Sequence, residues 1–130
     1  MAERGARLLV ADDNKVNRLL LMRSLELQGH RAASAENGRL ALEMLRREPF
    51  DLLLLDMEMP ELDGLDATRR ICALLESKRP RIVAMTANAM QGDREMCIEA
   101  GMDDYLTKPI RVDRLIEVLN DVPVREGVLR

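Results

Sequence analysis

Short apolar runs alternate along the chain with longer segments in which apolar residues recur at helical spacing. Residues 51–55 hold four consecutive leucines and lack the polar alternation of a strand with one solvent-facing side. Such a strand is typical of the centre of a parallel sheet that is covered on both faces. Residues 112–119 differ, because Val112, Leu115, Ile116 and Leu119 form one apolar stripe of an amphipathic helix.

The same pattern over the whole chain predicts strands and helices in alternation. The strands are expected at residues 8–11, 30–34, 51–55, 81–85 and 104–107. The second strand is weak, since Ala32 and Ala33 are poor strand formers. The helices are expected at residues 15–28, 37–48 and 65–75, in a segment that ends near 100, and in one that spans 112–119 and ends by 123. Asn14 fits the cap of the first helix, and Gly29 and Gly101 fit the ends of the first and fourth.

This alternation predicts a single α/β domain with a doubly wound, mostly parallel sheet and helices on both faces. We expect the domain to cover residues 7–122, with 1–6 as an N-terminal extension and 123–130 as a tail or the start of a linker. Ligands of such sheets bind outside the carboxyl ends of the strands. The residues that follow each strand are therefore the first candidates for chemistry.

Composition narrows the possible functions. The net charge of −3 forces no strongly basic face, and aromatic residues make up 2% of the chain, so we expect no direct binding of nucleic acid. The longest apolar run is too short to span a membrane, and the N-terminus does not resemble a signal peptide. Cys72 and Cys97 form no CxxC motif, which favours a reduced, cytoplasmic setting.

Polar residues stand at the predicted strand ends, namely Asp12, Asp13, Asp56, Thr86 and Lys108. Three neighbouring carboxylates repel one another, and their pKa values should rise unless a cation lies among them. Mg²⁺ is the natural cation, because it takes oxygen ligands from one or two carboxylates. An ammonium and a metal aimed at one anionic group are typical of phosphoryl transfer, with Asp56 as the central candidate nucleophile.

Taken singly, each of these residues has an ordinary explanation. Asp12 and Asp13 could form a turn and a helix cap, and Asp56 could end a strand as a turn residue. Thr86 and Lys108 alone indicate nothing, because a lone lysine is usually solvated. The combination is more specific, because it places a chemically active residue at several consecutive strand ends.

The chain resembles the receiver domain of two-component response regulators over about residues 7–122. The resemblance rests on matching motifs in the family's order: Asp12-Asp13, Asp56 after the leucine run, Met59-Pro60 with Asp63-Gly64, Thr86-Ala87 and Lys108-Pro109. Residues 13–18 and 86–89 are most similar to receivers attached to hybrid histidine kinases. The family's fold is flavodoxin-like, with a five-stranded parallel sheet in the order 2-1-3-4-5.

The resemblance implies that Asp56 is the phospho-acceptor. Asp13 and Asp56 would bind Mg²⁺ directly, together with the backbone carbonyl of Glu58, and Asp12 would help through a water molecule. Lys108 would pair with the phosphoryl group and with Asp56.

The resemblance also assigns a conformational switch. Thr86 would hydrogen-bond a phosphoryl oxygen, and Tyr105 would be the aromatic switch residue. Glu58 and Asn88 would tune the lifetime of the phosphoryl group. The phosphodonor would be a histidine kinase or a histidine phosphotransfer protein, and the receiver would catalyse its own phosphorylation and dephosphorylation without being an enzyme for a separate substrate.

Two other functions compete with a phosphorylation switch. A haloacid-dehalogenase-like phosphatase also places an aspartate after a parallel strand, but its DxD pattern needs aspartate at Glu58 and its cap needs more residues than this chain has. A phosphorylation-independent binding module on the same fold would not need the intact set of site residues. The chain is expected to be either a stand-alone response regulator or a piece of a hybrid histidine kinase.

The first predicted helix carries more apolar residues than one buried face requires. We expect some of Leu19, Leu21 and Met22 to be exposed beside the site, as a docking face for the phosphohistidine partner. The alternative is a helix packed on two sides within the domain.

Overall fold

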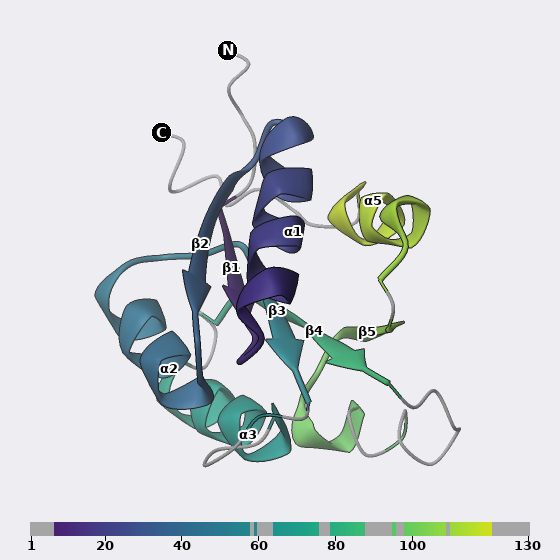
Figure 1. Ribbon diagram of the computed structural model, residues 1–130. Helices are drawn as coiled ribbons and strands as arrows, with labels where there is room; N and C mark the ends of the chain where they lie inside the picture. The colour runs from purple at the N-terminus through teal and green to yellow at the C-terminus, as the bar shows by residue number, and fades with distance from the viewer. Residues whose placement is uncertain are drawn as a thin grey trace.

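The computed structural model describes residues 7–57, 59, 64–75, 79–87, 95, 98–108 and 110–120. A single parallel sheet has helices on both faces (Figure 1). The elements are β1 (Arg7–Ala11), α1 (Lys15–Leu27), β2 (Arg31–Ala35), α2 (Gly38–Arg47), β3 (Leu52–Asp56), α3 (Gly64–Leu75), β4 (Arg81–Thr86), β5 (Asp104–Thr107) and α5 (Val112–Asn120). Of the predicted fourth helix, residues 95 and 98–100 are described, and they are helical.

The sheet has the strand order β2-β1-β3-β4-β5, and every pairing is parallel. The flavodoxin-like order 2-1-3-4-5 is therefore confirmed. Strand order reverses between β1 and β3, which are hydrogen-bonded neighbours with Ala11 opposite Leu55. The carboxyl ends of β1 and β3 thus lie side by side at the point where such sheets bind ligands.

The leucine run of β3 supplies both halves of the core. All four side chains of Leu52–Leu55 are fully buried. Leu53 and Leu55 belong to the cluster with α2 and α3, while Leu52 and Leu54 belong to the cluster with α1 and α5. Burying a leucine side chain contributes roughly 1.5–3 kcal/mol, so β3 is firmly held and fixes the place of the residue at its end, Asp56.

Local signals set most element boundaries as the sequence predicts. The Asn14 side chain accepts a hydrogen bond from the Asn17 N–H at 3.0 Å and caps α1. Gly29 and Gly101 have φ values of +89° and +110°, a conformation that favours glycine where each helix ends. Asn37 caps α2 from outside the helix, with its side chain accepting from the Leu40 N–H at 2.8 Å.

Three strands end one residue later than expected, and one of the three apolar candidates on α1 is buried. The β3 and β4 strands run one residue further than expected, because Asp56 still pairs with Met85 and Thr86 pairs with Thr107 of β5. The second strand spans 31–35 instead of 30–34, in register with β1. Leu21 is not exposed but 7% accessible, because it packs on the sheet with Leu25.

Candidate functional site

Four strands deliver their polar end residues to one edge of the sheet. Asp12 follows β1 directly, Asp56 is the last residue of β3, Thr86 is the last of β4, and Lys108 follows β5. Asp12 and Asp56 are each 1% accessible, and Thr86 is also buried. Asp13 is exposed, so the site has two buried acids and one acid that faces solvent.

Three acids form one cluster at this edge. A carboxylate oxygen from each of Asp12, Asp13 and Asp56 lies within 4.8 Å of the others. The clustering follows from topology, since β1 and β3 are neighbours and the chain turns directly after β1. Three carboxylates at this separation offer the all-oxygen donor set that Mg²⁺ prefers.

Lys108 neutralises part of this negative charge. Its Nζ donates a hydrogen bond to Oδ1 of Asp56 at 2.8 Å, and the pair is largely buried. The Lys108 backbone N–H donates to the Thr86 carbonyl at 2.7 Å, which holds the end of β5 against the end of β4. The ammonium is therefore fixed on the candidate nucleophile by the backbone as well as by charge.

The two carboxylate oxygens of Asp12 differ in their hydrogen bonding. Its Oδ1 accepts a hydrogen bond from the Asn14 N–H at 2.9 Å, whereas Oδ2 is buried and has no hydrogen-bond partner. Burial raises the pKa of Asp12, and the nearby Asp56 carboxylate raises it further, although the Asn14 N–H and Lys108 counteract this. An orphaned, buried carboxylate oxygen fits a site that takes a cation and its water shell.

Tyr105 lies on the sheet face that α2 and α3 cover. It is half-buried against that core cluster and stands opposite Ala84 of β4, a small and fully buried residue. Side chains alternate along a strand, so Thr86, two residues after Ala84, points to the same face as Tyr105. The two predicted switch residues thus share one side of the sheet.

Some predicted site residues lie outside the described residues. These are Glu58, Asn88, Pro60, Asp63 and Pro109. The roles of Glu58 as a carbonyl ligand and of Glu58 and Asn88 in phosphoryl lifetime therefore stay predictions. A cavity of about 450 Å³ between α1 and α5, which no pattern in the sequence predicts, borders the site at Asp12 and Lys108.

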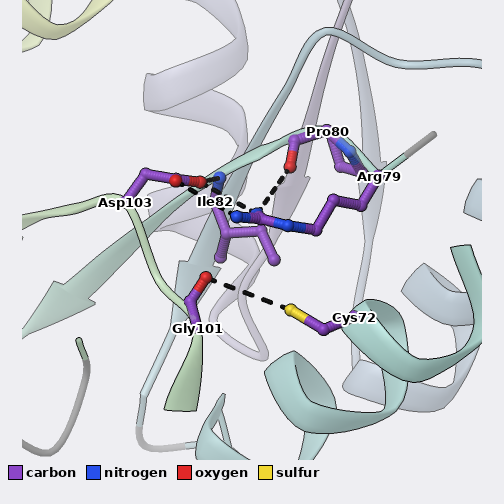
Figure 2. A network of polar contacts seen from close by, with 6 residues as sticks. All are labelled: Cys72, Arg79, Pro80, Ile82, Gly101 and Asp103. Carbon is purple, nitrogen blue, oxygen red and sulfur yellow. Dashed lines mark hydrogen bonds and ion pairs between the residues drawn. The ribbon is translucent and has the colours of Figure 1, made fainter. Parts of the chain in front are cut away.

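A second polar network at the opposite edge of the sheet was also not predicted (Figure 2). Arg79 donates to both carboxylate oxygens of Asp103, at 2.9 and 3.2 Å, and the Ile82 N–H donates to Asp103 at 2.8 Å. Nearby, a side chain on Gly101 would collide with the Cys72 sulfur, since a Cβ would lie 2.8 Å from it. The network ties the segment before β5 to the segment before β4.

Asp103→Asn is expected to lower the free energy of unfolding by about 2 kcal/mol at neutral pH, because it removes charge-assisted hydrogen bonds from a partly buried site. Burial alone would raise the pKa of Asp103, but Arg79 and the Ile82 N–H outweigh it and lower the pKa. The Arg79–Asp103 pair thus stabilises the folded protein at pH values above 3.8, the ordinary pKa of an aspartate. This stabilisation is lost as the pH falls through the lower pKa of Asp103 in the folded protein.

Urea titrations at several pH values measure this difference. Glu117→Gln is the control, because it removes the exposed ion pair with Arg114, which should contribute little. A constant difference between the natural protein and Asp103→Asn down to strongly acidic pH would contradict the ion-pair explanation.

Residues 8–120 match the family model of the response regulator receiver domain. The chain belongs to this family. Sensor histidine kinase GacS of Pseudomonas protegens is 41% identical over 123 residues, which are 92% of this chain and 13% of that protein. BarA of Escherichia coli, a signal transduction histidine-protein kinase, is 38% identical over 85% of this chain and 12% of its own length. The receiver thus spans about an eighth of these curated relatives.

Solved receiver structures agree in fold. The receiver domain of sensor histidine kinase PA1611 from Pseudomonas aeruginosa, solved with a magnesium ion in its active site cleft, is 40% identical. The match has a TM-score of 0.81 and covers 89% of this chain and 95% of that one. The Saccharomyces cerevisiae Ssk1 receiver, solved with the phosphotransfer protein Ypd1, matches at 25% identity and a TM-score of 0.85, over 89% of this chain and 87% of that one.

The chain is accordingly a receiver domain of two-component or phosphorelay signalling, and sensor histidine kinases are among its relatives. Aspartyl phosphorylation and magnesium binding are typical of the family. In the part of the chain that the structure describes, no helix combines the length and hydrophobicity needed to cross a bilayer.

Proposed function

We propose that this receiver accepts a phosphoryl group on Asp56 from a phosphohistidine of a partner protein, in a magnesium-dependent transfer that switches the domain's conformation. The observation that supports it most is the Lys108 ammonium, 2.8 Å from Asp56 Oδ1 in a cluster of three acids. A buried carboxylate with its own counter-ion and further acids beside it is more than a turn or a cap requires.

In the transfer, a carboxylate oxygen of Asp56 attacks the phosphorus atom. The new P–O bond forms as the P–N bond to the histidine breaks, and the electron pair of that bond returns to the imidazole nitrogen. Lys108 would turn toward the negative phosphoryl oxygens, and the Thr86 hydroxyl would donate to one of them. Positioning and charge neutralisation supply most of the catalysis in such a reaction.

The residues present fit a magnesium site. Asp13 and Asp56 would be direct ligands together with the Glu58 carbonyl, and Asp12 would act through water. Bound Mg²⁺ supplies positive charge that offsets the phosphoryl oxygens during transfer. The magnesium-containing PA1611 receiver, at 40% identity, supports this assignment.

We place the receiver at residues 7–122, in a cytoplasmic protein that is phosphorylated by a histidine kinase or a histidine phosphotransfer protein. The Ssk1 receiver solved with Ypd1 supports this class of partner. The curated histidine kinase relatives support a histidine kinase parent over a stand-alone response regulator. The domain itself would turn over only its own phosphoryl group.

Incubation with acetyl phosphate and Mg²⁺ separates the three candidate functions. A phosphorylation switch takes up one base-labile phosphoryl group per chain. A phosphatase-like enzyme hydrolyses many equivalents of acetyl phosphate while little label stays on the protein. A phosphorylation-independent binding module does neither, and that result would contradict the proposed function.

Leu19→Glu is expected to slow transfer from a histidine phosphotransfer protein about tenfold, which corresponds to about 1.4 kcal/mol. Leu19 is 57% exposed, and Val16 and Leu20 beside it on α1 are 62% and 63% exposed. These residues lie in the first turns of α1, which begins two residues after Asp13 of the acid cluster. A partner docked on them would therefore reach Asp56. Met22 is half-buried, so we expect it to contribute less to the docking of the partner.

Rapid-quench kinetics with the cognate phosphotransfer protein measure the transfer rate. Leu27→Glu is the control, since Leu27 is 74% exposed at the far end of the same helix. Acetyl phosphate labelling should be unchanged in both variants. Equal transfer rates for Leu19→Glu and the natural protein would show that this face does not dock the donor.

Tyr105 emission is expected to change when beryllofluoride and Mg²⁺ mimic the phosphoryl group on Asp56. The chain has one tyrosine and no tryptophan, so its intrinsic emission reports on this residue alone. Movement of Thr86 toward the mimic would open space on the sheet face that Tyr105 shares, and the ring could turn inward. The change should vanish in Asp56→Asn and weaken in Thr86→Ala. Constant emission while the mimic is bound would leave Tyr105 a structural residue.

A further inference from the structure

Arg18, in the first turn of α1, is bound to the turn that carries the acid cluster. Its guanidinium Nη1 donates a hydrogen bond to the backbone carbonyl of Asp12 at 2.7 Å. The Arg18 side chain is half-buried, and it lines a groove together with Ser34 and Ala35 of β2. Arg18 thus reaches from α1 back to the residue that follows β1.

The backbone on both sides of Asp13 is tied down. The Asp12 N–H donates to the Ala35 carbonyl at 3.2 Å, and the Asp12 carbonyl accepts from Arg18. The Asn14 N–H donates to Oδ1 of Asp12 at 2.9 Å. Asp12 is 1% accessible, so its backbone groups need protein partners in place of water. For the Asp12 carbonyl, Arg18 is that partner.

Asp13 itself is exposed, and no hydrogen bond or ion pair reaches its side chain from the residues that the structure describes. Its carboxylate nevertheless lies within 4.8 Å of those of Asp12 and Asp56. Like charges at this separation repel each other, and an exposed side chain is free to turn away into solvent. The place of Asp13 in the cluster therefore depends on the backbone ties at Asp12 and Asn14.

Helix electrostatics does not explain why an arginine stands at position 18. The N-terminus of a helix carries partial positive charge, which favours acidic residues in the first turn and disfavours basic ones. The first turn of α1 has no acidic residue and contains both Lys15 and Arg18. Residues that break a local rule are expected at functional sites. The hydrogen bond to Asp12 supplies a reason that is specific to this position.

We propose that Arg18 is a positioning residue of the phosphotransfer site, which holds the turn after β1 so that Asp13 stays in the acid cluster before metal binds. The inference rests on the proposed magnesium-dependent transfer and deepens it. Arg18 acts through the Asp12 carbonyl and has no contact with the metal or the phosphoryl group. Because the turn is ordered in advance, less ordering is required when Mg²⁺ binds.

Charge and positioning predict opposite effects when Arg18 is replaced. Removing a positive charge from the surroundings of a cation site should strengthen Mg²⁺ binding. Releasing the turn should weaken it, because the ligands must then be ordered at the moment of binding. Arg18→Met separates the two effects, since methionine keeps an unbranched side chain and a good helix propensity but cannot donate a hydrogen bond.

Magnesium titrations followed by the backbone amide NMR signal of Asp13 measure the metal affinity. In Arg18→Met we expect the dissociation constant to rise about tenfold, at the lower end of what the outer partners of metal ligands contribute. Arg18→Lys restores the charge and a donor, and it should recover part of the affinity.

Arg23→Met is the matched control. Arg23 is exposed on the same helix, and its side chain has no hydrogen bond or ion pair with the residues that the structure describes. The substitution removes the same charge from α1 without touching the turn. Its dissociation constant for Mg²⁺ should stay within about twofold of that of the natural protein.

Two further measurements distinguish positioning from a general structural role. In the metal-free protein, the Asn14 amide proton should exchange with solvent at least fivefold faster in Arg18→Met, while exchange in β3 stays unchanged. Labelling of Arg18→Met by acetyl phosphate should be slow at limiting Mg²⁺. At saturating Mg²⁺ its rate should come within about twofold of the natural rate, since the turn is ordered once the site is filled. Circular dichroism establishes that the variants are folded.

Unchanged or tighter Mg²⁺ binding in Arg18→Met would overturn the proposal, and so would an equal loss of affinity in Arg23→Met. Faster exchange in β3 as well as at Asn14 would show that Arg18 stabilises the whole fold and not the turn. A natural protein without a Mg²⁺-dependent shift at Asp13 would count against the proposed function. Exchange at Asn14 decides separately whether Arg18 holds the turn, and unchanged exchange in Arg18→Met would refute that.

Discussion

Asp56→Asn is expected to abolish labelling by acetyl phosphate and by a phosphohistidine donor, with a loss beyond a hundredfold. Asparagine has nearly the same shape but no carboxylate oxygen that can attack phosphorus. The fold should persist, because the substitution keeps the buried volume and removes one of three mutually repelling charges. Lys108 keeps Asp12 as a nearby negative charge and is 23% exposed, so it is not left stranded.

Asp66→Asn is the matched control for this substitution. Asp66 is an exposed aspartate in the first turn of α3 and is not a member of the acid cluster, so the variant should label fully. Melting temperature and circular dichroism establish that both variants are folded. Stoichiometric labelling of folded Asp56→Asn would refute the assignment of the acceptor.

Saturating Mg²⁺ is expected to raise the melting temperature by about 10 °C. A ligand at a hundred times its dissociation constant adds about 2.7 kcal/mol to a protein that binds it only when folded, and 1 kcal/mol shifts a domain of this size by about 4 °C. Asp13→Ala should lose the shift, because it removes the exposed ligand of the cluster. The same variant should be as stable as the natural protein, or more so, without metal, since it relieves repulsion.

The stabilisation by Mg²⁺ should grow with pH. The pKa of Asp12 is raised in the folded protein, so ionising it costs stability as the pH rises above the ordinary value of 3.8 and through the higher folded-state value. A cation favours the ionised form of Asp12, so its binding should strengthen as the pH rises through the folded-state pKa of Asp12. Differential scanning fluorimetry at pH 5 and pH 7.5 measures this. If Mg²⁺ raised the melting temperature equally at both pH values, or raised that of Asp13→Ala as much as that of the natural protein, a metal site at this cluster would be contradicted.

The architecture was predictable because its signals are local and strong. The unbroken leucines of β3 indicate a strand buried on both faces, and the cap at Asn14 marks where α1 begins. The grouping of the candidate site residues was also predictable, because the carboxyl ends of parallel strands meet at one edge of the sheet. Asp12, Asp13, Asp56, Thr86 and Lys108 are each tied to a strand end.

Features that depend on packing between distant segments were not predictable. Arg79 and Asp103 are 24 residues apart, and the pairing of β4 with β5 brings them together. Apolar spacing in α1 did not distinguish Leu21, which packs on the sheet, from Leu20, which is exposed. The cavity between α1 and α5 depends on how closely the two helices approach, which no residue pattern encodes.

The most direct test is to locate the phosphoryl group after transfer. The protein is mixed with a phosphorylated histidine phosphotransfer protein and Mg²⁺, converted with borohydride to a stable derivative of the acyl phosphate, digested and sequenced by mass spectrometry. The PA1611 receiver, which holds magnesium in its cleft, serves as the control for a competent donor. We predict modification of Asp56 alone, absent when Mg²⁺ is chelated. Modification of another aspartate, or none from a donor that phosphorylates the control receiver, would contradict the proposed function.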